Sequence, residues 1–169
     1  MAFRDYIYKG FLYSDPDTAI ILCDEMLAFA NERNFPIGQA QALRYKGIVS
    51  SNKNDTSAAL NYFTQSLKIY KQAGYQEGIA NSLISIGKFY RKQGDYINAL
   101  DYYHQGLEVQ QQMDNQKGIA SSLHSIGNLY FYLRDFPKAI DYHMQSLAIK
   151  KQLGNQKGMA TTLNNIGFI

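Results

Sequence analysis

The chain has 169 residues, a single cysteine and a formal net charge of +3 at pH 7. So small an excess of positive charge, without a run of five Lys or Arg residues, excludes a phosphate-binding stripe, and we expect no nucleic-acid partner. The lone Cys23 excludes an internal disulfide and favours a reducing compartment, so we expect a cytoplasmic location. The periplasm is the alternative if the parent protein is a membrane sensor.

The sequence also argues against insertion into a membrane. It contains no apolar run of about 18 residues, and residues 1–5 lack the features of a secretory signal. Prolines are few and no linker or low-complexity tract interrupts the chain. We therefore expect one all-α domain with no direct membrane insertion of this segment.

An internal repeat organises the chain. Residues 78–117 and 118–157 match at 19 of 40 positions without a gap, and a glycine recurs at this interval at Gly38, Gly78, Gly118 and Gly158. A repeat this short cannot bury its own apolar face, so neighbouring copies must stack. The predicted repeats are approximately 1–37, 38–77, 78–117 and 118–157, followed by an extra helix at 158–169.

Each repeat predicts two amphipathic helices. Apolar side chains recur at helical spacing in its first half, as at Leu83, Ile86 and Tyr90, and again in its second half. The first repeat has the least regular pattern; its register residues are Phe3, Ala19, Cys23 and Leu27, with Ile7 where the others have a small residue. About nine helices follow from this pattern.

Turn residues and glycines refine the prediction. Asp95 and Asp135 are placed as helix N-caps, and four residues are placed as left-handed helix ends: Asn34, Gly74, Asp114 and Gly154. Glycine inside a helix costs about 1 kcal/mol relative to alanine, so a close helix approach is expected at Gly47, Gly87, Gly127 and Gly167. The expected facing residues are Ala59, Ala99 and Ala139.

The pattern of one repeat, Leu83, Ile86, Gly87, Tyr90, Ala99, Tyr103 and Leu107, returns in the next as Leu123, Ile126, Gly127, Tyr130, Ala139, His143 and Leu147. It resembles the tetratricopeptide repeat (TPR), in a variant with a forty-residue period and Leu in place of the usual Trp. The resemblance covers essentially the whole chain. It implies a right-handed superhelical solenoid of antiparallel helix pairs whose concave face binds protein or peptide.

A search for catalytic or metal-binding patterns is mostly negative. His104, His124 and His143 fall on three predicted helices without the i, i+4 spacing of a helical metal site, and His143 replaces Tyr103, which indicates a packed side chain. The acidic pair Asp24 and Glu25 is read as a solvated helix face. We expect no catalytic residue, no metal and no cofactor, and a protein that is not an enzyme.

The family's geometry implies a partner-binding face on the first helices. Its candidate contact residues are Arg44, Asn81, Lys88, Arg91, His124, Asn128, Phe131 and Tyr132. Lys88 and Arg91, with Arg44, would attract an acidic segment, Asn128 would hold a peptide backbone, and the two aromatic residues would serve as anchors. The alternative is that the cations are merely solvated and the aromatic residues are ordinary packing.

Known branches of the family are matched only in part. The chaperone-binding clamp of Lys, Asn, Asn, Lys and Arg would correspond here to His124, Asn128 and Asn165 at three positions. Bacterial peptide-pheromone receptors grip peptide with an Asn of the first helix, and those positions read Tyr45, Ser85, Ser125 and Asn165. The repeats also resemble arrays in bacterial sensor kinases and cyclases, which implies a docking or scaffolding part of a larger signalling protein.

The last predicted helix suggests an alternative function. It carries Ile166, Phe168 and Ile169 without a following partner helix, so we expect a fragment of a longer protein or an end covered by self-association. In the second case the chain would be a structural spacer that forms a homo-oligomer through its open end or convex face. Trimming the final helix would then abolish activity, whereas changes on the first-helix face would not.

Overall fold

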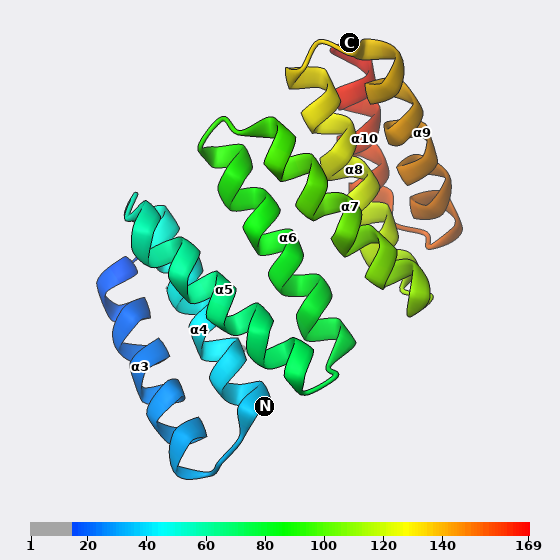
Figure 1. The fold of residues 1–169 in the computed structure, drawn as a ribbon. Coiled ribbons are helices and arrows are strands. Elements are labelled where there is room, and N and C mark those ends of the chain that lie inside the picture. The colour runs from blue at the N-terminus through cyan, green and yellow to red at the C-terminus, as the bar shows by residue number, and fades with distance from the viewer. Residues whose placement is uncertain (1–14) are drawn as a thin grey trace. The chain divides into compact units, whose positions relative to one another are not determined.

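The computed structural model describes residues 15–169, and within this range the protein is all-α (Figure 1). The helices are α3 (Pro16–Glu32), α4 (Pro36–Asn52), α5 (Thr56–Gln72), α6 (Gln76–Lys92), α7 (Tyr96–Gln112), α8 (Gln116–Tyr132), α9 (Phe136–Gln152) and α10 (Gln156–Gly167). These are eight of the nine expected helices. The ninth, with Phe3 and Ile7, was predicted in a segment outside the described residues.

The chain divides into two compact units, the first ending at Ile86 and the second comprising Gly87–Ile169, so that the boundary falls within α6. In the first unit α4 packs against α3 and α5, and in the second α8 packs against α7 and α9 while α10 packs against α9. Consecutive helices within each unit run antiparallel (Figure 1). The predicted helix pairs are therefore confirmed, whereas the boundaries of the forty-residue repeats stay predictions.

Local chemistry explains why the helices begin and end where they do. The side chains of Asp95 and Asp135 accept hydrogen bonds from the backbone N–H groups of Asn98 and Lys138, which confirms both predicted N-caps. A residue of positive φ follows each helix from α3 to α9, and the four predicted ones are confirmed: Asn34, Gly74, Asp114 and Gly154. Seven of the eight helices have 17 residues as a result.

The core of the first unit forms where α3 meets α4. Ala19 and Cys23 from α3 pack with Tyr45 and Val49 from α4, and all four side chains are fully buried. Burial raises the pKa of the Cys23 thiol to about 12, so this cysteine behaves as a small apolar side chain, as its register position predicts.

The close approach at the helix glycines is confirmed at three positions, but the predicted facing residue was wrong. A Cβ on Gly47, Gly87 or Gly127 would meet a ring at 2.6, 2.8 or 2.9 Å, and the rings belong to Phe63, Tyr103 and His143 rather than to Ala59, Ala99 or Ala139. A flat ring fills the space between two helices that a methyl group would leave empty. The fourth glycine, Gly167, has no described atom within 4 Å of such a Cβ.

None of the described helices is long and apolar enough to span a bilayer.

Candidate functional site

Two of the eight predicted contact residues lie in the first unit. Asn81 is exposed on α6, but Arg44 is buried, with only 7% of its surface exposed. The Arg44 guanidinium lies 4.7 Å from the ring centre of Tyr45, and its Nη1 donates a hydrogen bond to Ser85 Oγ at 3.5 Å. Arg44 therefore packs between helices in this structure and presents little surface to a partner.

The predicted cationic pair lies at the start of the second unit. Lys88 and Arg91 are both exposed, and they are three residues apart in the last turns of α6. Arg91 also lies beside the hydroxyl of Tyr103, where its charge opposes the rise that burial causes in the pKa of this phenol. Cations near the C-terminal end of a helix stabilise it through the helix dipole, so the pair has a structural role as well as a surface suited to an anion.

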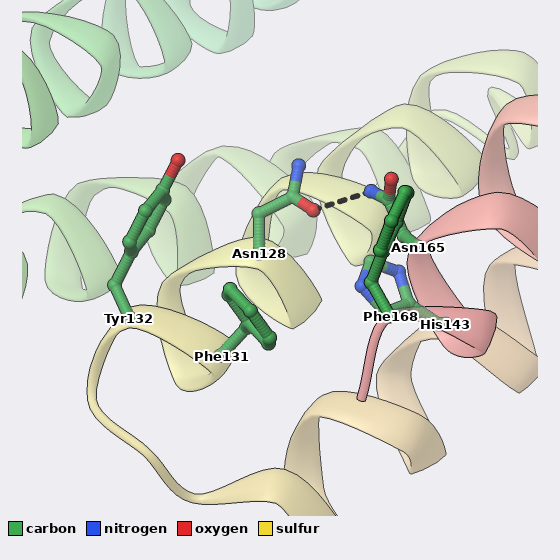
Figure 2. Close-up of a pocket in the computed structure, with 6 residues that line it drawn as sticks. All are labelled: Asn128, Phe131, Tyr132, His143, Asn165 and Phe168. Atoms are coloured by element: carbon green, nitrogen blue, oxygen red, sulfur yellow. Dashed lines mark hydrogen bonds between the residues drawn. The ribbon is translucent and has the colours of Figure 1, made fainter.

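Three of the four remaining predicted residues line a pocket of about 430 Å³ in the second unit (Figure 2). Its lining residues are Asn128, Phe131 and Tyr132 from α8, His143 from α9, Asn165 from α10 and Phe168, which follows α10. Asn165 Nδ2 donates a hydrogen bond to Asn128 Oδ1 at 2.7 Å across the pocket, and the rings of Phe131 and Phe168 lie near this amide pair (Figure 2).

Three of the six lining residues were not among the predicted contact residues. His143 was predicted to be packed, which its 1% exposure confirms, but its place at the pocket was not foreseen. Asn165 was noted as a position at which family members grip peptide, and Phe168 as an apolar residue after the last helix, but neither was among the candidate contact residues. The signal was in the repeat: the lining residues occupy positions that one repeat earlier hold Lys88, Arg91, Lys92, Tyr103, Ser125 and Asn128.

The sixth predicted residue of this unit, His124, belongs to a polar cluster beside the pocket. Its Nδ1 lies 3.2 Å from Thr162 Oγ1, its Nε2 lies 3.5 Å from Asn165 Nδ2, and its ring centre lies 5.1 Å from that of His143. Lys150 Nζ donates to Thr162 Oγ1 at 2.7 Å, and the described part of the chain gives this buried lysine no carboxylate partner.

Burial favours the uncharged forms of the titratable side chains in this cluster. Desolvation, followed by the positive charge of Lys150 and then His143, lowers the pKa of His124 to about 4. The pKa of His143 is lowered by the same burial and by Lys150, and burial also lowers the pKa of the Lys150 ammonium. At neutral pH both imidazoles are therefore neutral, and each has one nitrogen that donates and one that accepts.

The pocket offers hydrogen bonds and aromatic surface. Its lining contains no Asp, Glu, Lys or Arg side chain. Among residues 15–169, no group of three or more His, Cys, Asp and Glu side chains is arranged to hold a metal ion. Such a site is suited to holding a side chain or a backbone segment by contact and hydrogen bonding.

One known sequence family matches part of the chain. Residues 78–152 match the model of the tetratricopeptide repeat. Residues 78–152 therefore contain tetratricopeptide repeats. TPR modules generally bind proteins and are typically not catalytic. No curated protein gave a significant match.

Solved structures confirm the TPR-like fold. BtubC from P. vanneervenii has a TM-score of 0.80 at 22% identity, over 91% of this chain and 65% of its own. Aspartyl phosphate phosphatase F from Bacillus subtilis has a TM-score of 0.85 at 14% identity, over 95% of this chain and 41% of its own. The apo form of RapI has a TM-score of 0.81 at 20% identity, over 99% and 62%. The TPR chain thus spans less than two thirds of each of these three proteins, and at such identities the likeness concerns the fold alone.

Proposed function

We propose that this chain is a docking module that binds a protein or peptide with an acidic segment through the exposed face of its first helices, α6 and α8. The observation that carries the proposal is the presence, within one compact unit, of an exposed cationic pair, Lys88 and Arg91, and an uncharged aromatic pocket. A partner segment would have its carboxylates attracted by the pair and an anchor side chain held by the pocket.

The chemistry of the pocket supports binding rather than reaction. Asn128 and Asn165 form an amide pair that leaves further donors and acceptors for a peptide backbone, and Phe131 and Tyr132 offer ring surface. Tyr132 is 50% exposed, so a partner could bury much of it. Phe131 and Tyr132 are therefore the proposed anchors, and no catalytic step is assigned to this chain.

The similar structures support a place in signalling. One is a Rap protein complexed with competence and sporulation factor, with a TM-score of 0.83 at 12% identity, over 90% of this chain and 43% of its own. By analogy, we assign this chain to the sensory or scaffolding part of a larger signalling protein. Since it spans only part of such proteins, the output of the parent protein lies beyond the proposal. A cytoplasmic location belongs to the same proposal, because Cys23 is buried and unpaired.

A self-associating spacer is the second candidate, and one observation favours it. Leu163 and Phe168 are 51% and 81% exposed at the end of α10, whereas Leu123, one repeat before Leu163, is only 5% exposed. Ile166 and Ile169 were also expected to be exposed, and this was wrong, because both are partly buried. A second copy of the chain covering this end would bury Leu163 and Phe168.

Affinity capture from the native organism's lysate tests the docking proposal. The parent chain is compared with the Lys88→Glu, Arg91→Glu double variant, and captured proteins are identified by mass spectrometry. The matched control is Lys68→Glu, Lys71→Glu, which reverses two exposed cations at the same three-residue spacing on α5. A partner lost only with the first variant supports docking. If all three baits return the same proteins, or only more of the parent protein, docking through α6 is rejected and the spacer becomes the better account.

A further inference from the structure

A comparison of two aromatic positions in the second unit shows how the pocket arises. Tyr103 and His143 occupy the same position in successive repeats, and each ring lies on a helix glycine, Gly87 or Gly127. Both side chains are 1% exposed. Burial raises the pKa of the Tyr103 phenol, and Arg91 and Ser125 lie close enough to its hydroxyl to oppose that rise. The phenol group therefore extends past the glycine to the neighbourhood of these two side chains.

In the following repeat the same space is left open. Imidazole is shorter than phenol and has no hydroxyl, so His143 cannot reach the residues at the corresponding positions, Phe131 and Asn165. All three of these side chains line the pocket, and the buried Nδ1 of His143 has no hydrogen-bond partner within the described residues. The replacement of Tyr by His thus removes a ring edge and its polar tip. The other lining positions change as well, from Lys88, Arg91, Lys92, Ser125 and Asn128 to side chains that are all amide or aromatic.

The lining sets the chemistry of a ligand. Phe131, Tyr132 and Phe168 supply ring surface, and Asn128 and Asn165 supply amide donors and acceptors (Figure 2). A charged side chain would find no counter-ion among the lining residues. A phenylalanine would find the rings but would desolvate the amides without pairing them. A phenol matches both, because it has an apolar ring and a hydroxyl that donates and accepts.

We infer that this pocket receives a tyrosine side chain of the partner segment, which takes the place that the phenol of Tyr103 holds in the preceding repeat. The inference rests on the proposed docking function and names the anchor residue of the partner. Phe168 is 81% exposed and Tyr132 50% exposed, so both lining rings present free surface to an entering ring.

Two small probes that differ only by the hydroxyl group test the inference: N-acetyl-tyrosinamide and N-acetyl-phenylalaninamide. Each is titrated into the whole chain, and binding is followed by NMR through the side-chain amide signals of Asn128 and Asn165. We expect the tyrosine probe to shift both signals and to bind about fivefold more tightly than the phenylalanine probe, the gain of about one hydrogen bond. Equal binding of the two probes, or shifts confined to other residues, would overturn the inference.

Three variants locate the binding. His143→Tyr fills the pocket with the chain's own phenol and should weaken binding of the tyrosine probe at least about tenfold by direct exclusion. The matched control His104→Tyr makes the same change on α7 outside the lining residues and should bind as the parent does. Phe168→Ala removes an exposed wall, so it should weaken binding without lowering the melting temperature, and it decides the question if His143→Tyr does not fold.

The outcomes separate this inference from the proposed function. If the tyrosine probe does not bind but partner capture is lost with Lys88→Glu, Arg91→Glu, the phenol pocket is rejected and the docking proposal stands. If the probe binds at Asn128 and Asn165 while capture is unaffected by that double variant, the pocket is supported and docking through α6 is rejected.

Discussion

The ring of Tyr103 lies directly on the α-carbon of Gly87. A Cβ added to Gly87 would stand 2.8 Å from two ring carbons, closer than van der Waals contact allows, although the glycine lies inside α6. Glycine in a helix interior costs about 1 kcal/mol relative to alanine. This cost is offset because a glycine at this position leaves room for a buried ring between two helices.

Gly87→Ala should therefore destabilise the protein, even though alanine is the better helix former. Overpacking costs typically about 1–3 kcal/mol, which exceeds the gain in helix propensity. Gly167→Ala is the matched control, because a Cβ there would meet no described atom within 4 Å, and it should leave stability unchanged or raise it by less than about 1 kcal/mol. Urea unfolding of both variants measures the difference. Equal effects of the two substitutions would contradict the close approach as its cause.

The second unit should lose stability in mild acid. The pKa of His124 is lowered from 6.5 to about 4 by burial, with Lys150 and His143 adding positive charge, and the pKa of His143 is lowered as well. Between these values the unfolded chain binds more protons than the folded one. The stabilising contribution is thus fully present above pH 6.5 and is lost as the pH falls toward 4.

Urea unfolding at about pH 7.5 and about pH 5 measures this loss for the parent and for His124→Asn. The variant lacks one of the two titrating groups, so its stability should fall less between the two conditions. His104→Asn is the control and should behave as the parent does. An identical fall in all three proteins would assign the acid sensitivity to groups other than His124.

Lys150→Gln tests the electrostatic part of the cluster. Gln110 holds the same position one repeat earlier and its Oε1 accepts a hydrogen bond from Ser122, so a glutamine at 150 has a ready partner in Thr162. The substitution removes the positive charge that helps to lower the pKa of both His124 and His143. Both pKa values should therefore rise, as measured by NMR titration of the imidazole signals.

The neighbouring substitution Lys151→Gln controls for the change in net charge, because Lys151 is exposed. It should leave the two histidine pKa values near those of the parent. If Lys150→Gln also leaves them unchanged, burial alone is the cause.

The double variant Lys88→Glu, Arg91→Glu should keep its helicity and melt within a few degrees of the parent. Both side chains are exposed, so the expected cost is the unfavourable charge at the end of α6, about 0.3–1 kcal/mol for each residue. Circular dichroism measures both properties. A large loss of stability would mean that weakened partner capture reports unfolding rather than lost contacts.

Capture by the parent chain should also weaken as salt is added, because exposed charges are screened over about 10 Å at 0.1 M ionic strength. If the charge-reversed variant captures the partner at low salt as well as the parent chain does, the result counts against an acidic partner.

The turn chemistry was predictable because its signals are local. Asp95 caps a helix through the N–H three residues later, and Asp114 ends one through its own backbone conformation, so neither depends on a distant residue. The forty-residue period is equally visible in the sequence and determines the alternation of helices. These features predict the fold class and the TPR resemblance without any information on tertiary contacts.

The packing partners depended on tertiary structure. Ala139 was expected to face Gly127, but the nearest atoms belong to the ring of His143, one helical turn after Ala139. Arg44 was expected on the partner-binding face because the family's geometry places it there, yet its guanidinium packs on Tyr45 and reaches Ser85, forty-one positions away. Helical periodicity cannot show which neighbouring side chain covers such a residue.

The sequence by itself thus determined the helices and their ends, and it supplied candidates for partner contact. Tertiary structure alone decided which side chains lie together: it joined the candidate Asn128 to Asn165 across a separation of 37 residues and left the candidate Arg44 buried. The physical reason is that helix formation and capping are decided within a few residues of the chain, whereas a pocket is the space that remains after side chains from several helices have packed.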